Sequence, residues 1–227
     1  MNKRRKNQQV SFGLANARSL WEKTNSLADC FKELGLSFAV IKETWFHEGQ
    51  QLDKLAIDIH GEHGLSMINK MRKKNGRNNP GGGVSIVFDK TKIKLKEHKV
   101  TRGRLEIVAA TGKFPNNTRP FYIIGVYIST RLRANSFHDL LSCLSDIILK
   151  IKTEVSSPYI VLAGDFNNKK IDEAIGDYPD MTIVMSGATR GNAVLDEVAT
   201  SFTSELTGVA SPTMDGPRIT RVHGLRL

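Results

Sequence analysis

Cysteine is scarce in this chain. Of its 227 residues only Cys30 and Cys143 are cysteines, and they lie neither in a Cys-x-x-Cys nor in any other metal-ligand spacing. The sequence therefore offers neither a disulfide framework nor a cysteine-based zinc site. Two isolated cysteines are typical of an intracellular, reducing location, which is what we expect for this protein.

Long apolar runs are missing as well. No stretch approaches the about 18 apolar residues that a membrane-spanning helix needs. Residues 10–15, which follow a basic start, are too few and too polar for the apolar core of a signal peptide. With 40% hydrophobic and 25% charged residues, the composition is that of an ordinary globular protein. We expect a basic tail over residues 1–7 and one domain over residues 8–227, because single domains commonly reach about 200–250 residues.

Acidic residues are outnumbered by basic ones. The chain has 33 Lys and Arg against 23 Asp and Glu, which gives a net charge of +10 and an isoelectric point near 9.7. This excess favours a polyanionic partner, and a generally basic, solvated surface is the plain alternative. Basic residues cluster at 70–77 and at 3–6. The second cluster fits a nuclear-localisation signal, a nucleic-acid arm or a frayed tail.

Hydrophobic periodicity predicts a mixture of strands and helices. The clearest helix is 134–152, where apolar residues recur at three- and four-residue intervals, and a second is expected over 19–34. Residues 75–83, rich in Asn, Gly and Pro, are expected to form a loop. Turn-rich segments between the strands in the middle of the chain predict a multi-stranded antiparallel element. The expected strands are 10–15, 37–41, 83–88, 92–97, 104–111, 120–128, 158–163 and 193–200.

Polar residues stand where several of these strands end. The apolar run 159–163 breaks at Gly164 and then presents Asp165 and Asn167. A carboxylate there can take a proton from attacking water, and an amide can hold a phosphate oxygen. An Asx turn that closes the strand is the structural alternative. The other strand-end polar residues are Asn16, Glu43, Tyr127 and Asp196.

The order of these residues along the chain resembles that of the endonuclease/exonuclease/phosphatase family. Six phrases look like the apurinic/apyrimidinic-type endonuclease domain of non-LTR (LINE-like) retrotransposons, and the similarity covers roughly residues 8–200. The phrases are Asn-Ala-Arg-Ser-Leu (16–20), Glu-Thr-Trp (43–45), Gly-Gly-Gly-Val (81–84), Gly-Val-Tyr (125–127), Gly-Asp-Phe-Asn (164–167) and Thr-Arg-Gly-Asn-Ala-Val-Leu-Asp (189–196).

The resemblance implies a DNase I-like, four-layered α/β sandwich, in which two packed mixed sheets are flanked by helices and the active site lies at one edge. It implies a divalent metal, usually Mg²⁺ with Mn²⁺ as a substitute, bound by Glu43. It also implies that Asp165 orients or deprotonates the attacking water. The residues expected to hold the scissile phosphate are Asn16, Asn167 and Tyr127, and Asp196 is expected to brace a catalytic His.

The C-terminal part of the chain departs from the family pattern. The family closes its site with Ser-Asp-His, and this chain has no such phrase. His223 is the candidate for the catalytic His, with Val222 in place of the Asp. Because His223 stands only four residues from the end, we expect the last strand to be missing and the domain to be atypical or truncated after about residue 210.

The resemblance and the charge together predict a metal-dependent DNA endonuclease of retrotransposon origin. Two alternatives stay open at this point: a catalytically inactive nucleic-acid-binding remnant of the same fold, and a small-molecule or lipid phosphoesterase of the superfamily. The expected DNA contacts are Arg190 with Thr189, and Arg72, Lys73, Lys74 and Arg77.

Overall fold

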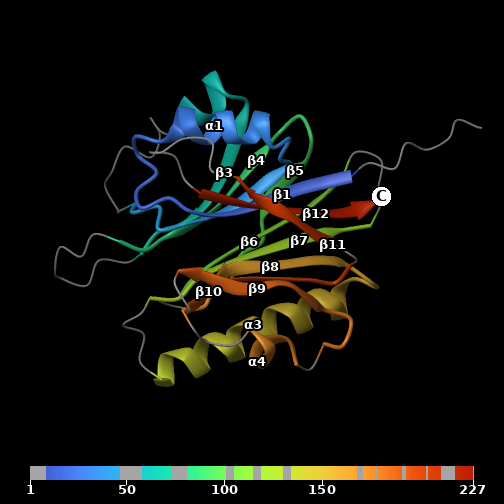
Figure 1. Cartoon of the computed structure of the whole chain (residues 1–227). Coiled ribbons are helices and arrows are strands. Elements are labelled where there is room, and N and C mark those ends of the chain that lie inside the picture. The colour runs from blue at the N-terminus through green and yellow to red at the C-terminus, as the bar shows by residue number, and fades with distance from the viewer. Residues whose placement is uncertain are drawn as a thin grey trace, which may run out of the picture.

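The computed structural model describes most of the chain in a single α/β arrangement (Figure 1). The described residues are 9–46, 58–72, 81–100, 105–114, 119–129, 134–167, 171–176, 178–190, 193–202, 204–210 and 218–226. The expected tail over residues 1–7 and most of the basic cluster at 70–77 lie outside this set.

Two sheets make up the centre of the described part. The first has the strand order β11-β12-β1-β2-β4-β3, and the second has the order β5-β6-β7-β8-β10-β9. The first sheet consists of β1 (Gln9–Asn16), β2 (Phe38–Lys42), β3 (Leu65–Lys70), β4 (Val84–Asp89), β11 (Ser204–Ala210) and β12 (Arg218–Arg226). The second consists of β5 (Lys94–Glu97), β6 (Glu106–Lys113), β7 (Phe121–Tyr127), β8 (Tyr159–Asp165), β9 (Thr182–Arg190) and β10 (Ala193–Thr200).

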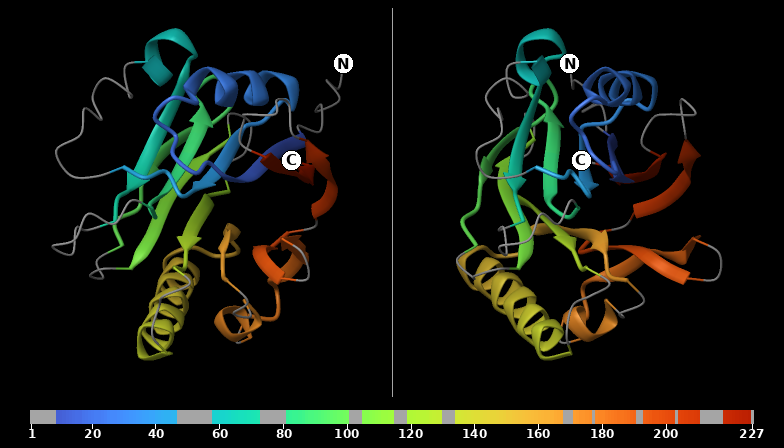
Figure 2. Two further views of the ribbon diagram at one scale, coloured as in Figure 1. Left: turned by 60° about the vertical axis from the view of Figure 1, so that its left-hand side comes forward. Right: turned by 90° about the vertical axis from the view of Figure 1, so that its left-hand side faces the viewer.

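Helices cover the outer face of each sheet, which gives four layers (Figure 2). Helix α1 (Thr24–Glu33) and the π-helical turn η1 (Asp58–Glu62) pack on the first sheet, and α3 (Ala134–Glu154) and α4 (Asp172–Ile175) pack on the second. In the described part of the chain, none of the helices has the length and apolarity needed to cross a bilayer.

The inner strands β2, β4, β7 and β8 are buried on both faces, so alternate residues enter different cores. On β2, Phe38 and Val40 belong to the cluster between the sheets, whereas Ala39 and Ile41 belong to the cluster under α1. All five residues of this strand are buried. Because side chains alternate with a period of two, the face of any strand-end residue follows from its inward-facing neighbours.

This alternation turns several polar side chains toward the space between the sheets. Val161 and Ala163 on β8 belong to the inter-sheet cluster, and Asp165 is the next residue of that series. Lys42 continues the series of β2 in the same way. Both strands end at these residues, so the polar groups lie at one end of the inter-sheet core.

The predicted four-layered sandwich is confirmed, but the expected loss of its last strand is wrong. β12 pairs antiparallel with β1 on one side and with β11 on the other. Its sequence, Arg-Ile-Thr-Arg-Val-His-Gly-Leu-Arg, mixes basic and apolar residues without a clean two-residue period. That weak pattern hid the strand from sequence analysis.

Two further expectations need correction. The expected helix over 19–34 begins only at Thr24, because the backbone N–H groups of Ser19 and Leu20 bind the carbonyls of Glu43 and Thr44 instead. The antiparallel element expected in the middle of the chain holds for β5, β6 and β7. The strand expected at 83–88 is β4, which pairs with β2 and β3 in the other sheet and so does not belong to that element.

Phe121 provides a test of the inter-sheet core. Its ring is fully buried and makes edge contacts with Phe38 and Phe114. We expect Phe121→Ala to lower the free energy of unfolding by about 3–5 kcal/mol, because a large cavity forms between the sheets. Urea denaturation followed by circular dichroism measures the change. Leu149→Ala is the control, since Leu149 is 54% exposed on α3, and equal effects of the two changes would contradict this packing.

Candidate active site

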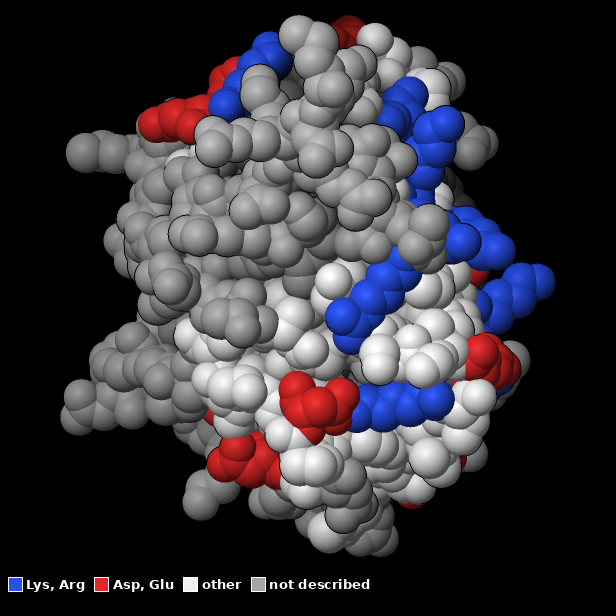
Figure 3. Space-filling view, turned by 90° about the vertical axis from the view of Figure 1, so that its right-hand side faces the viewer, with Lys and Arg blue, Asp and Glu red and all other residues white. Residues whose placement is uncertain are grey.

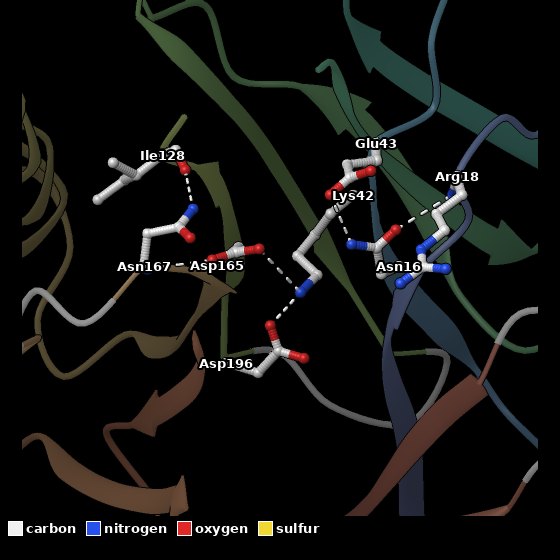
Figure 4. Close-up of polar contacts among 8 residues, drawn as sticks. All are labelled: Asn16, Arg18, Lys42, Glu43, Ile128, Asp165, Asn167 and Asp196. Carbon is white, nitrogen blue, oxygen red and sulfur yellow. Dashed lines mark hydrogen bonds and ion pairs between the residues drawn. The ribbon is translucent and has the colours of Figure 1, made fainter. Parts of the chain in front are cut away.

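The ends of four strands and the first half of a fifth bring polar residues to one edge of the sandwich, and most of these residues are drawn in Figure 4. Asn16 and Lys42 are paired at the ends of the parallel strands β1 and β2. Tyr127 and Asp165 are paired in the same way at the ends of β7 and β8, and Asp196 on β10 lies opposite Asp165. Carboxyl ends of parallel strands meet at one edge of a sheet, which explains the convergence.

Glu43 is held by Asn16 and by the backbone around it. Asn16 Nδ2 donates a hydrogen bond to Glu43 Oε1 at 2.8 Å, and Arg18 N–H donates to Asn16 Oδ1 at 3.1 Å. Glu43 has φ of 51° and Trp45 has φ of 59°, a left-handed conformation that costs free energy for residues other than glycine. Trp45 N–H donates to the Gly82 carbonyl at 2.9 Å. The orientation of the Glu43 carboxylate is thus fixed by its surroundings.

The glycines at 81–83 permit this close approach. All three have positive φ, and a Cβ on Gly82 would lie 2.3 Å from the Arg72 guanidinium. A Cβ on Gly83 would lie 2.5 Å from Thr44 Oγ1. Only glycine therefore lets this loop pack against the residues beside Glu43.

A buried ion triad connects the two sheets. Lys42 Nζ lies 3.5 Å from Asp165 Oδ2 and forms an ion pair with Asp196 Oδ1. The exposed fractions of the side chains are 2% for Lys42, 5% for Asp165 and 16% for Asp196. Buried charges need partners of the opposite sign, and here the single ammonium is shared by two carboxylates.

Asp165 is both a turn residue and a group with a shifted pKa. Its Oδ1 accepts a hydrogen bond from Asn167 N–H at 3.0 Å, so the Asx turn is confirmed. Burial raises the pKa of Asp165 to about 6; Asp196 adds to this rise, and Lys42 and the Asn167 N–H oppose it. The carboxyl is thus ionised at neutral pH and still basic enough to accept a proton from water.

Tyr127 and Glu106 form a second part of this edge. Burial, with the negative charge of Glu43 next in importance, raises the pKa of Tyr127 to about 12, so its hydroxyl keeps its proton. Glu106 accepts a hydrogen bond from Arg72 Nε at 2.6 Å and another from Gly83 N–H. Burial raises the pKa of Glu106 above its usual range, while these two donors oppose the rise.

Sequence analysis missed Lys42 and Glu106. Each occupies the inward-facing position of its strand: Lys42 follows Phe38 and Val40 on β2, and Glu106 precedes Val108 on β6. The signal in the sequence was a charged residue at the next or the preceding position of an every-second-residue apolar series, which places that charge on the buried face of the strand.

Not all predicted site residues join this edge. The structure brings together Asn16, Glu43, Tyr127, Asp165, Asn167 and Asp196. His223 does not agree with the expectation that it completes the site. On β12 it pairs with Ser11, five residues along β1 from Asn16, which is about 17 Å at the rise of a strand.

The predicted DNA contacts divide into three groups. Arg72 is engaged by Glu106, and its guanidinium carbon lies 5.6 Å from the centre of the Tyr127 ring. Thr189 and Arg190 end β9, and Arg190 pairs with Ala193 at the start of β10, three residues before Asp196. Only the backbone of Thr189 and Arg190 is described. Lys73, Lys74 and Arg77 lie outside the described residues.

Positive charge also gathers away from this edge. Figure 3 views the molecule from the side on which β12 ends, and there Lys and Arg side chains run in a stripe across the surface. At the end of β6 far from Glu106, a pocket of about 670 Å³ is lined by Lys94, Lys96, Lys99 and Lys113, among others. The basic composition is therefore spread over more than one face.

Glu43 is the described residue best suited to a divalent cation. In the described part of the chain, no three His, Cys, Asp or Glu side chains cluster as a complete metal site. Mg²⁺ is often bound through one or two carboxylates, with phosphate oxygens and water completing its shell. Glu43 has one oxygen fixed by Asn16 and keeps the other for a cation, so the donor set fits Mg²⁺ or Mn²⁺ that is shared with a phosphate.

The pKa of Asp165 can be tested directly. We expect the carboxyl of Asp165 to titrate near pH 6. We expect Asp196→Asn to lower that pKa, because the change removes a nearby negative charge and Lys42 then pairs with Asp165 alone. Carboxyl carbon NMR measures both values. Asp180→Asn, at the surface beside Lys152, is the control and leaves the pKa unchanged. Titration of Asp165 near the usual value of a free aspartate would contradict the burial argument.

Comparisons with known proteins identify the fold. No family model matches the chain, and no curated protein matches it in sequence. Among solved structures, the endonuclease/exonuclease/phosphatase from Bacteroides vulgatus is similar with a TM-score of 0.67 and 14% identity, covering 97% of this chain and 99% of that one. The endonuclease domain of TRAS1, a telomere-specific non-LTR retrotransposon, is similar with a TM-score of 0.65 and 12% identity, and the match covers 96% of this chain and 99% of that one.

A phosphatase has the same fold. The mannosyl-6-phosphatase Bt3783 of Bacteroides thetaiotaomicron is similar with a TM-score of 0.62 and 9% identity, covering 94% of this chain and 98% of that one. At these identities the likeness establishes the fold and leaves the substrate open. The chain thus has the DNase I-like fold of two packed mixed sheets with flanking helices that is found in structures of the endonuclease/exonuclease/phosphatase family.

Proposed function

We propose that this protein is a metal-dependent DNA endonuclease that nicks a strand by attack of water on a phosphodiester. The observation that carries the proposal is that a buried carboxylate with a raised pKa, Asp165, lies at the same edge as an oriented carboxylate, Glu43, which can bind a cation. Asp165, with its pKa raised to about 6, and the Asn16–Glu43 pair lie at the same edge of the sandwich. Phosphodiester hydrolysis needs both a proton acceptor and a stabilised anionic oxygen.

Asp165, Tyr127 and Glu43 have different roles in the proposed reaction. Asp165 accepts the proton of the attacking water, and the Asn167 N–H holds this carboxylate in place. Tyr127 stays protonated and donates a hydrogen bond to a phosphate oxygen. Mg²⁺ at Glu43, or Mn²⁺ in its place, would neutralise charge that develops on the phosphate.

The structure suggests different roles for the two amides than the resemblance implied. The Asn16 amide donates to Glu43 and so orients the cation ligand. The Asn167 amide donates to the Ile128 carbonyl and so ties the ends of β7 and β8 together. In this arrangement both amides act as positioning residues for the carboxylates.

DNA is the proposed substrate because of charge and fold together. The net charge of +10 attracts a polyanion, and the TRAS1 endonuclease domain from a non-LTR retrotransposon has this fold. Arg190 and Thr189, on the hairpin next to Asp196, are the proposed contacts to the DNA backbone. We also propose that the protein acts in the nucleus, with the basic residues 3–6 as its nuclear-localisation signal.

A catalytically inactive, nucleic-acid-binding protein is the second candidate. It is favoured by the register of His223, which lies away from the site. It is also favoured by Lys42, whose ammonium already pairs with both Asp165 and Asp196. The mannosyl-6-phosphatase neighbour keeps phosphate-ester hydrolysis of a small molecule as a third candidate.

Nicking of supercoiled plasmid in Mg²⁺ tests the proposal. We expect Asp165→Asn to slow nicking by about 10²–10⁴-fold, because a general base is lost. Glu43→Gln is expected to slow it by at least about 100-fold, because several kcal/mol of charge stabilisation depend on the cation. The matched controls are Asp180→Asn and Glu154→Gln on the surface.

Absence of Mg²⁺-dependent nicking, or equal rates in all variants, would refute the endonuclease proposal. Salt-sensitive binding of duplex DNA in the absence of nicking would then support the second candidate. Release of phosphate from sugar phosphates without nicking would support the third.

The pH profile gives an independent check of the base. Nicking is expected to fall as the pH drops through about 6, because Asp165 then gains a proton and no longer accepts one. In Asp196→Asn the fall is expected at lower pH, since the pKa of Asp165 is lower. Single-turnover nicking rates between pH 5 and pH 8, a window of about one to two units around that pKa, measure the profile. A profile that Asp196→Asn leaves unmoved would contradict the role of Asp165.

A further inference from the structure

The shared ammonium of Lys42 is the most unusual feature of the candidate site. Asp165 and Asp196 are directly opposed on the antiparallel strands β8 and β10. Lys42 reaches them from the other sheet and contacts both carboxylates (Figure 4). Its side chain is almost entirely buried, so its charge is compensated inside the protein.

Two opposed carboxylates need a counter-cation. Without one they repel each other, and one of them would have to take up a proton. In hydrolases that act on phosphate esters, such a pair commonly holds a divalent cation, often as one of two ions about 4 Å apart. Asp165 and Asp196 therefore have the composition of half a metal site.

Lys42 already supplies that positive charge. Its ammonium is tethered to β2, and the strand holds it in phase with Phe38 and Val40, so it cannot leave as a bound ion can. With Lys42 present, the triad carries one net negative charge in place of two. A divalent cation entering between the carboxylates would have to displace a buried ammonium and leave it unpaired, which is costly.

We propose that Lys42 is the built-in counter-cation of Asp165 and Asp196 and excludes a divalent cation from this half of the site. The protein then binds a single divalent cation, at Glu43. Lys42 is a positioning residue, because its ammonium contacts Asp165 Oδ2 and so holds the carboxylate that accepts the proton from water. This inference deepens the proposed function and rests on it for its chemical meaning.

Counting bound Mn²⁺ tests the inference. Electron paramagnetic resonance of free Mn²⁺, titrated into the full chain without DNA, measures how many ions bind. We expect one ion in the unaltered protein and none in Glu43→Gln. Lys42→Met removes the ammonium at similar volume and is expected to gain an ion between the carboxylates. Lys42→Arg keeps the charge and is expected to bind one.

Two further variants make the count specific. In Lys42→Met/Asp165→Asn the gained ion is expected to be lost again, because one of its ligands is neutral. Lys92→Met is the control, since Lys92 is a half-exposed lysine that also pairs with a carboxylate, Asp89, and donates to the Leu36 carbonyl away from the site. It is expected to bind one ion.

Two ion counts would contradict the proposal. Two ions bound by the unaltered protein would overturn it, as would a folded Lys42→Met protein that binds only one. If Lys42→Met does not fold, Glu43→Gln decides, because an ion retained in that variant would contradict a single site at Glu43. A thermal unfolding curve that Mn²⁺ shifts more in Lys42→Met than in the unaltered protein gives the same information by mass action.

The ion count tests the role of Lys42, and the plasmid assay tests the endonuclease proposal, so either proposal can be refuted without the other. A protein without nicking activity still binds one ion or two, so loss of the endonuclease proposal leaves the role of Lys42 testable. A count of two with intact nicking would leave the endonuclease and remove the proposed role of Lys42.

Discussion

The alternation of side chains along strands that are buried on both faces controls where the polar groups of this site lie. Val161 and Ala163 fill the space between the sheets, so Asp165 must enter the same space. The same period turns Lys42 inward from the opposite sheet. The packing of the two sheets thus brings a lysine and a carboxylate into contact although 123 residues separate them in the chain.

Burial then sets the chemistry of these groups. Transfer from water raises the pKa of Asp165, Glu106 and Tyr127, because each charged form loses hydration. Lys42 and Arg72 each compensate a neighbouring carboxylate at this edge. A basic aspartate, a neutral phenol and an oriented glutamate thus result from burial at one edge of the sandwich together with the paired charges around them.

Much of this arrangement follows from local sequence. Asp165 and Asn167 were recognisable because a buried strand has no need of an acid at its end, and the long apolar periodicity of α3 predicted its helix. Lys42 and Glu106 were overlooked, because their partners are distant in sequence and nothing adjacent to them marks a site. β12 was overlooked for a related reason: its residues alternate poorly, and its stability comes from pairing with β1 and β11.

The sequence by itself determined the mixture of strands and helices, the order of the strand-end residues and the excess of positive charge, because each depends on composition or on short-range periodicity. The layered fold was predicted by the resemblance of its phrases to a known family. Tertiary structure alone decided which of those residues meet. The register of β12 places His223 beside Ser11, away from Asn16, and the packing of the two sheets places Lys42 between Asp165 and Asp196. Register and sheet packing are set by contacts between distant segments, so no local pattern in the chain specifies them.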